Sequence, residues 1–278
     1  MGGVHHVRVR GSRSLMLSTK LAVAKVLGSV AVGRTVGWAS RDRIRSRGVI
    51  VSTRSPLVPP QVKGLLRSGL YESAEARMVG AHLRTDLPVV ELGASIGFVT
   101  ALIGRRRPPR IVAVEANPAL IQSICETLAM NGVTGVDVVH TAIAYDFAGS
   151  NAGRRRARLQ VSDFNLGSSI LVGRSVDHDS HDVDVPATSL GQLLRDHDIE
   201  RYTCVCDIEG AELAMITNEV APIVDGCQQL IIELHERQIT GEVVRIPVLV
   251  DAIATRWGLT PVAHDGNVWR FERISTAS

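Results

Sequence analysis

The chain has 278 residues, of which 45% are hydrophobic and 21% are charged, and its net charge is +3. This length and apolar fraction are enough for one large α/β domain with a complete core, which excludes a predominantly disordered chain. Residues 1–50 hold ten Lys or Arg but a single acidic residue, so this segment carries +9 and the remainder carries −6. The pattern predicts a basic arm followed by a mildly acidic body.

The first apolar segment, residues 15–38, is interrupted by Lys20, Lys25 and Arg34. It contains no run of about 18 uncharged apolar residues, so we expect it not to span a membrane. Two interpretations stay open: a helix that packs on the catalytic domain, and a basic interfacial helix that rests on anionic lipid. We assign residues 1–64 to a basic N-terminal extension that ends in a proline-rich loop.

The most informative segment runs from an apolar stretch at 88–92 through a glycine turn at 93–97 to a second apolar stretch at 111–115. This order predicts a β-loop-α-β nucleotide cradle in which backbone amides approach the ligand without an intervening Cβ. Glu115 ends the second strand, where a carboxylate can accept both hydroxyls of a ribose. The middle glycine position is Ser95, so we expect a nucleoside without phosphates rather than a dinucleotide.

Apolar runs and helical segments alternate through the rest of the chain, which predicts a mainly parallel sheet with right-handed crossovers. The last two runs are separated by only three residues, so they form a hairpin and one of them must be antiparallel. The expected strands are 88–92, 111–115, 136–140, 203–207, 228–234, 260–264 and 267–272. The expected helices are 72–84, 96–104, 117–130, 189–197, 209–218 and 246–257.

The alternation lapses between residues 145 and 186, and we interpret this segment as an insertion that recognises the acceptor substrate. It is expected to contain strands at 158–162 and 183–185 with a loop at 165–169. Five Asp and His residues within 177–182 look like a metal cluster, but adjacent ligands on a polar loop are more typical of a solvated acidic turn.

Six sequence blocks carry a resemblance to a known family. The most specific is Asp207-Ile208-Glu209-Gly210-Ala211-Glu212. The others are GLYE at 69–72, VEANP at 114–118, NG at 131–132, TSL at 188–190 and IIELH at 231–235. Over about residues 65–272 the chain resembles the FkbM family of methyltransferases, which use S-adenosyl-L-methionine.

This resemblance implies a Rossmann-like class I methyltransferase fold in residues 65–278. The fold has a mainly parallel seven-stranded sheet with an antiparallel C-terminal hairpin strand, here preceded by an N-terminal helical extension. The implied cofactor is S-adenosyl-L-methionine, a nucleoside without phosphates, in agreement with the expectation from Ser95.

The resemblance also implies which residues bind the cofactor. It assigns Glu91, Gly93, Ala94 and Gly97 to the methionine side, Glu115 to the ribose, Ala116, Asn117, Thr141 and Ala142 to the adenine, and Tyr71 with Glu72 to a segment that closes over the cofactor. Two of these residues also have a structural interpretation. Glu91 can order the loop, and Asn117 can cap the helix that Pro118 begins.

Methyl transfer to an alcohol needs a group that removes the hydroxyl proton next to the electrophilic methyl. Asp207 and Glu209 follow one predicted strand and His235 follows the next, so we expect them to meet at the carboxyl edge of the sheet. We interpret these three as the catalytic residues and assign no metal ligands. Other readings stay open: Glu209 complements a helix dipole, His235 is only structural, or the three hold a divalent cation.

N-methyltransferases that resemble this fold typically carry an Asn/Asp-Pro-Pro-aromatic run after the strand that ends near Asp207. This chain has no such run there, so we expect an O-methyltransferase. The expected acceptor is a hydroxyl of a glycan, glycolipid or polyketide-type natural product. One alternative is a non-catalytic nucleotide-binding protein on the same fold. The other is an α/β-hydrolase, since residues 93–97 also fit a Gly-x-Ser-x-Gly elbow and Ser95, Asp207 and His235 follow the hydrolase order.

Nucleic acid is not an expected partner, because the arginine clusters lack interleaved aromatic residues. The four cysteines contain no CxxC pair and are expected to be reduced thiols, which favours a cytoplasmic location. The basic N-terminus adds the expectation of peripheral contact with an anionic membrane.

Overall fold

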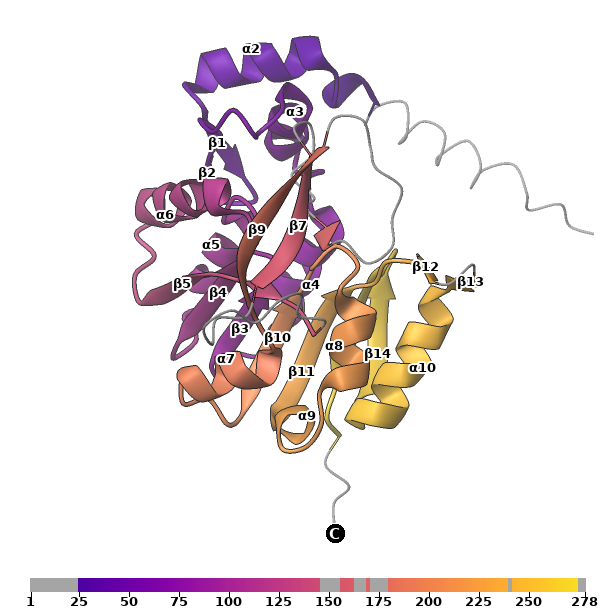
Figure 1. The fold of residues 1–278 in the computed structure, drawn as a ribbon. Helices are drawn as coiled ribbons and strands as arrows, with labels where there is room; N and C mark the ends of the chain where they lie inside the picture. The colour runs from indigo at the N-terminus through magenta and orange to yellow at the C-terminus, as the bar shows by residue number, and fades with distance from the viewer. Residues whose placement is uncertain (1–24, 146–155, 163–168, 171–179, 240–241, 275–278) are drawn as a thin grey trace, which may run out of the picture.

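The computed structural model describes residues 25–145, 156–162, 169–170, 180–239 and 242–274. Its centre is a seven-stranded sheet in the order β14-β15-β11-β10-β3-β4-β5, with helices on both faces (Figure 1). These strands are β3 (Val89–Leu92), β4 (Ile111–Glu115), β5 (Val136–His140), β10 (Tyr202–Cys206), β11 (Cys227–Glu233), β14 (Thr260–Asp265) and β15 (Val268–Glu272). All seven lie within one residue of the predicted ranges.

Strand direction follows from the connections. The pairs β3-β4, β4-β5, β3-β10 and β10-β11 are parallel, whereas β15 runs antiparallel to both β11 and β14. Both faces of β3, β4 and β10 are buried, which explains why their sequences are continuous apolar runs rather than alternating apolar and polar residues. The predicted Rossmann-like fold, with a mainly parallel seven-stranded sheet and an antiparallel strand in its C-terminal hairpin, is confirmed.

Helices enclose the sheet in two layers. One layer consists of α7 (Leu190–Asp196), α8 (Glu212–Asn218), α9 (Ile223–Gly226) and α10 (Ile246–Trp257), and the other of α4 (Ser73–His82), α5 (Phe98–Arg105) and α6 (Ile121–Met130). The predicted helix 117–130 is divided, because Pro118–Leu120 forms a 3-10 turn before α6. The predicted helix 209–218 begins only at Glu212, because Glu209 and Gly210 both adopt positive φ angles.

Residues 25–68 form an N-terminal module that includes α2 (Val30–Ser40), the hairpin of β1 (Arg43–Ser46) and β2 (Val49–Ser52), and α3 (Pro60–Ser68). The hairpin was not predicted. Pro60 begins a helix instead of ending a loop, since proline fits the first helical turn. The expected domain boundary at 64/65 falls inside α3, and Ile44 shares a buried cluster with Phe98 of α5. No helix in the described ranges is long and apolar enough to cross a membrane.

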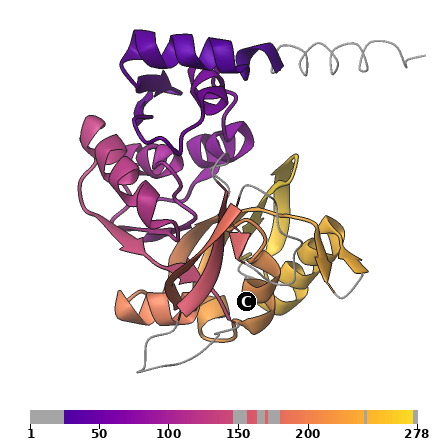
Figure 2. The same cartoon turned by 45° about the horizontal axis from the view of Figure 1, so that its top comes forward.

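The insertion forms most of a four-stranded sheet in the order β6-β9-β7-β8, in which β6 comes from the segment just before it. Its strands are β6 (Ala142–Ile143), β7 (Arg156–Ser162), β8 (Ser169–Ile170) and β9 (Ser180–Thr188). Figures 1 and 2 show β7 and β9 as a long antiparallel arm in front of the main sheet. Both predicted strands of the insertion are present and longer than expected, whereas most of the predicted 165–169 loop and the cluster members at 177–179 lie outside the described residues.

Gly93 fixes the distance between two strands. A Cβ on Gly93, which has a φ of +92°, would lie 1.8 Å from the backbone oxygen of Asp207. We expect Gly93→Ala to lower the free energy of unfolding by at least about 3 kcal/mol, because it combines left-handed strain with a backbone clash. Gly69→Ala is the matched control: its φ is also positive at +71°, nothing lies within 4 Å, and strain alone costs about 1 kcal/mol. Equal losses in urea denaturation would contradict a backbone contact at Gly93.

Candidate active site

A cavity lies at the carboxyl edge of the sheet, where the loops after β3, β4 and β10 meet. Its lining is Tyr71, Glu72, Gly93, Ser95, Val114, Glu115, Ala116, Thr141, Ala142, Ile143, Leu159, Asp207, Ile208 and Glu209. Seven of the eleven residues assigned to the cofactor line it, together with two of the three catalytic candidates. This edge is where open α/β sheets bind ligands.

The glycine turn is held by the neighbouring strand. The backbone N–H groups of Gly93 and Ala94 both donate to the carbonyl of Val114, each at 2.9 Å. Ser95 follows with a φ of 51°, and its N–H donates to Glu115 Oε2 at 2.7 Å. The turn and the carboxylate after β4 therefore form one hydrogen-bonded unit.

Glu115 lies in the cavity wall with its orientation fixed from two sides. Its Oε1 accepts the N–H of Asn117 at 2.7 Å, while Oε2 accepts that of Ser95. Each oxygen keeps a second lone pair for a ligand hydroxyl. Burial raises the pKa of Glu115 to about 7, although these backbone hydrogen bonds favour the charged form.

The other four predicted cofactor residues do not line the cavity. Glu91 is buried behind the turn, its Oε2 has no partner among the described residues, and burial raises its pKa to about 8. Ala94 packs in a cluster with Ile124, and a Cβ on Gly97 would come within 3.0 Å of that residue. Asn117 caps the 3-10 turn, with Oδ1 accepting Ala119 N–H at 3.0 Å. In this structure these four residues shape the loop.

Ile143 and Leu159 line the cavity although neither was predicted as a site residue. Leu159 comes from β7, so the insertion supplies part of the wall of this cavity. The signal was present in the sequence: Ala157 and Leu159 alternate with Arg156 and Arg158, and the apolar pair is buried.

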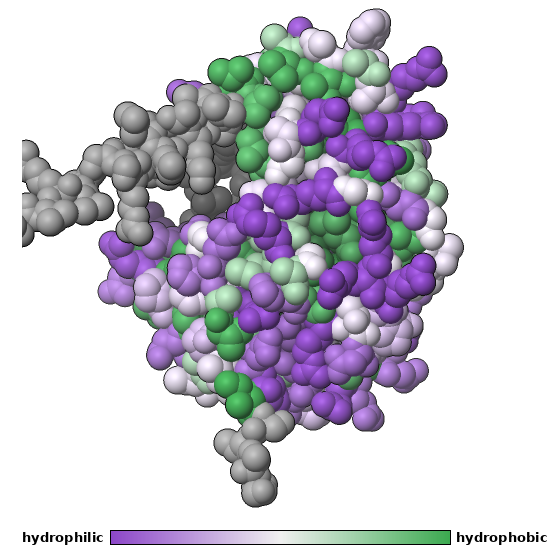
Figure 3. Space-filling view, turned by 180° about the vertical axis from the view of Figure 1, so that it is seen from behind, coloured by the Kyte–Doolittle hydropathy of each residue, from purple (hydrophilic) through white to green (hydrophobic). Residues whose placement is uncertain are grey.

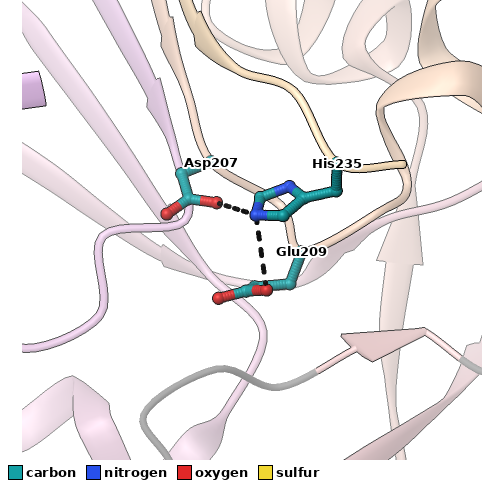
Figure 4. Close-up of side chains that lie close together, drawn as sticks. All are labelled: Asp207, Glu209 and His235. Carbon is teal, nitrogen blue, oxygen red and sulfur yellow. Dashed lines mark ion pairs between the residues drawn. The ribbon is translucent and has the colours of Figure 1, made fainter. Parts of the chain in front are cut away.

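The three catalytic candidates meet as expected, from the end of β10, the turn after it and the end of β11 (Figure 4). The Nε2 of His235 lies 3.7 Å from Glu209 Oε2 and 4.0 Å from Asp207 Oδ1. Its Nδ1 lies 3.0 Å from Oε1 of Glu212, a side chain only 1% exposed. A further carboxylate, Glu233 Oε1, lies 4.0 Å from Nε2.

The electrostatics of this group are dominated by burial and like charge. Burial, followed by repulsion from Glu209 and Glu233, raises the pKa of Asp207 to about 8. Burial alone would lower the pKa of His235, but the hydrogen bond and charge of Glu212, with the charges of Asp207 and Glu209, raise it to about 9. In the ligand-free protein at neutral pH His235 is therefore a cation, and the proton acceptors of the site are carboxylates.

The hydrolase alternative does not fit this geometry. Ser95 Oγ lies 3.4 Å from the hydroxyl of Tyr71, and both ring nitrogens of His235 face carboxylates. A Ser-His-Asp triad requires the serine hydroxyl on one ring nitrogen and the aspartate on the other. Ser95, Asp207 and His235 do not form that relay.

The sequence model of the methyltransferase FkbM domain matches residues 91–254, which is more than half of the chain. The chain belongs to the FkbM methyltransferase family. The protein is accordingly an S-adenosylmethionine-dependent methyltransferase. A comparison with curated proteins gives no match.

Several solved structures are similar to this FkbM protein at low identity. A protein of the NADB-Rossmann superfamily from Streptococcus agalactiae is 12% identical, with a TM-score of 0.38 over 71% of this chain and 65% of that one. The ribosomal protein L11 methylase of Lactobacillus delbrueckii subsp. bulgaricus is 12% identical, with a TM-score of 0.39 over 71% and 74%. TYW2 of M. jannaschii, solved with AdoMet, is 13% identical, with a TM-score of 0.35 over 83% and 85%. Family membership rests on the sequence match rather than on these structures.

Removing the carboxylate of Glu115 should weaken cofactor binding. We expect Glu115→Gln to raise the Kd for S-adenosylmethionine at least about tenfold in isothermal titration calorimetry, because two charge-assisted hydrogen bonds to ribose are weakened. Ser95→Ala keeps the backbone N–H that Glu115 accepts, so its Kd should change less than about threefold. Unchanged affinity in Glu115→Gln would contradict the ribose assignment.

The same carboxylate predicts a pH dependence. With a pKa of about 7, Glu115 is mostly protonated at pH 6 and mostly charged at pH 8, and the charged form accepts both ribose hydroxyls. The affinity of the wild type should therefore rise between pH 6 and pH 8. In Glu115→Gln the rise should be smaller, since only the other titrating groups of the site remain.

Proposed function

We propose that this FkbM protein methylates a hydroxyl group of a glycan, glycolipid or polyketide-type natural product. The observation that carries the proposal is a second cavity that adjoins the first. Its lining is Glu209, Gly210, His235, Glu236, Arg237, Ile246 and Asn267. Glu209 lines both cavities, so an acceptor in the second would face a cofactor in the first across one carboxylate.

The chemistry of the shared wall suits an alcohol. A lone pair of the acceptor oxygen attacks the methyl carbon, the carbon-sulfur bond breaks, and its electron pair stays on sulfur as a neutral thioether. The hydroxyl proton passes to a carboxylate of the Asp207 and Glu209 pair. A base works best when its pKa is near the working pH, and the raised pKa of Asp207, about 8, meets that condition.

The lining of the second cavity supports a hydroxyl-rich acceptor. Most of its residues carry hydrogen-bonding side chains: two carboxylates, the guanidinium of Arg237, the imidazole of His235 and the amide of Asn267. Ile246, at the start of α10, contributes an apolar side chain. Such a mixture fits a sugar ring or an oxygenated polyketide better than a purely apolar molecule.

Mass spectrometry of glycans and lipids from a deletion strain tests the function. The strain should accumulate one species that lacks a single methyl group, and the wild-type gene should restore it. Glu209→Gln should restore less than a tenth of the product, since general-base catalysis contributes about a hundredfold or more. Glu242→Gln, an exposed acid on β13 (Glu242–Val244), is the matched control and should restore it fully. Cofactor binding without any methylated product would favour the non-catalytic alternative.

We also propose that α2 rests on an anionic membrane and brings the site to a lipid-linked acceptor. Val26, Val30 and Trp38 are 63%, 41% and 84% exposed on this helix or just before it. Arg34 lies between them, and the view from behind shows hydrophobic residues gathered along the top of the molecule (Figure 3). The charge of +9 in residues 1–50 complements anionic lipid.

Vesicle co-sedimentation tests this contact. The wild type should bind phosphatidylglycerol vesicles and bind phosphatidylcholine vesicles several-fold less. Val30→Asp should lower the bound fraction, because the charge enters the apolar face of α2. Val248→Asp is the matched control, since Val248 is an exposed valine on α10, at 58% exposure, and should leave binding unchanged. Absence of binding to anionic vesicles would overturn the proposal.

A further inference from the structure

Asp207, Glu209 and His235 offer three ligand atoms that lie within 4.8 Å of one another. They are two carboxylate oxygens and one imidazole nitrogen, and they come from the end of β10, the turn after it and the end of β11 (Figure 4). The sheet brings them together from two strands rather than from one flexible acidic loop. The buried strands β10 and β11 therefore position Asp207 and His235, whereas Glu209 extends from the turn after β10.

The distances in this group are wrong for hydrogen bonds. His235 Nε2 lies 3.7 Å from Glu209 Oε2 and 4.0 Å from Asp207 Oδ1. An N–H···O hydrogen bond needs about 2.7–3.2 Å, so a proton on Nε2 bridges neither oxygen well. Two ligands held at about 2.1–2.3 Å from one metal ion are separated by about 3–4.5 Å, depending on the angle between them. The observed separations lie inside that range.

Glu212 fixes the orientation of the imidazole from behind. Its Oε1 lies 3.0 Å from His235 Nδ1 and also accepts the N–H of Gly210 at 2.9 Å. Because this carboxylate is nearly fully buried, it would keep the proton on Nδ1 when a cation displaces the proton on Nε2, and Nε2 is the nitrogen directed at Asp207 and Glu209. A histidine that donates one nitrogen to a buried carboxylate and turns the other toward oxygen ligands is the usual arrangement in metal sites.

The Oδ1 atom of Asp207 supplies an independent observation. It is inaccessible to solvent and has no hydrogen-bond partner among the described residues, although it is the oxygen that faces His235. A buried carboxylate oxygen without a partner is costly, and each such atom in a folded protein calls for an explanation. A cation between Oδ1 and Nε2 would satisfy both atoms.

We propose that Asp207, Glu209 and His235 bind a divalent cation, oriented through Glu212, at the acceptor end of the cofactor cavity. This inference rests on the proposed function and deepens it. Two carboxylates with a single imidazole suit Mn²⁺ or Mg²⁺ better than a thiolate-binding metal. With the cation bound, Asp207 and Glu209 would serve as its ligands rather than as the base. The cation would act as a Lewis acid that lowers the pKa of the acceptor hydroxyl, and the proton would leave to solvent or to a nearby carboxylate such as Glu233.

Calorimetric titration of chelator-treated full-length protein with MnCl₂ tests the site. One equivalent of Mn²⁺ should bind, and the electron paramagnetic resonance signal of free Mn²⁺ should fall in parallel. His235→Gln and Glu209→Gln should each weaken this binding at least about tenfold, since the loss of even a residue that only supports a metal ligand costs about 10–100-fold. Glu209 is 40% exposed, so its variant tests the site without a change in the core.

The chain provides a matched control. His197 Nδ1 lies 3.6 Å from Asp137 Oδ2 at the surface, a comparable separation between a histidine and a carboxylate. His197→Gln should therefore leave Mn²⁺ binding unchanged. Absence of Mn²⁺ binding in the wild type, or equal loss in His197→Gln and His235→Gln, would overturn the metal site.

Two further readouts separate this inference from the function on which it rests. The affinity for S-adenosylmethionine should stay within about threefold of wild type in His235→Gln, because His235 does not line the first cavity and this variant keeps the carboxylate of Glu115. Methylation at full rate after chelation would contradict a catalytic role for the metal and leave the proposed methyltransferase function standing. Mn²⁺ binding in a protein that never methylates an acceptor would support the metal site and contradict the proposed function.

Discussion

The concentration of carboxylates at one buried edge of the sheet is the constraint on which the rest of this structure depends. Burial raises the pKa of Glu72, Glu91 and Asp207 to about 8 each, with like charges adding to the effect at all three. Such a group of acids is stable only when it holds protons or faces positive charge. The cationic His235, a sulfonium cofactor and a divalent ion are three ways to meet the same electrostatic demand.

This field also distinguishes the cofactor before and after the reaction. S-adenosylmethionine carries a positive sulfur, whereas the demethylated product is a neutral thioether. With the cofactor in the cavity that we propose for it, attraction between that sulfur and charged carboxylates around it would exist only before transfer, which would favour release of the product. The hydrogen bonds from Ser95 and Asn117 hold Glu115, which we propose as the ribose acceptor, in place regardless of the charge on sulfur.

Sequence reasoning located the strands well because their two-sided burial produces continuous apolar runs, and β4 (Ile111–Glu115) matches its prediction residue for residue. It missed β1 and β2, since each has only four residues and the pattern of so short a strand is weak. Position along the chain identified Asp207, Glu209 and His235 as neighbours. It did not distinguish cavity wall from scaffold: Glu91 and Asn117 look like ligand contacts in sequence, and only packing places them behind the loop.

The side chain of Asn131 joins the N-terminal module to the sheet domain. Its Oδ1 accepts the N–H of Ile50 at 2.9 Å, and its Nδ2 donates to the Ile50 carbonyl at 2.6 Å, as a neighbouring strand would. The amide thus acts as a one-residue extension of the hairpin. This link has a mechanical consequence. If α2 binds a membrane surface, the sheet domain is held in a fixed orientation relative to that surface. The mouth of the proposed catalytic cavity would then stay at a constant height and angle above it.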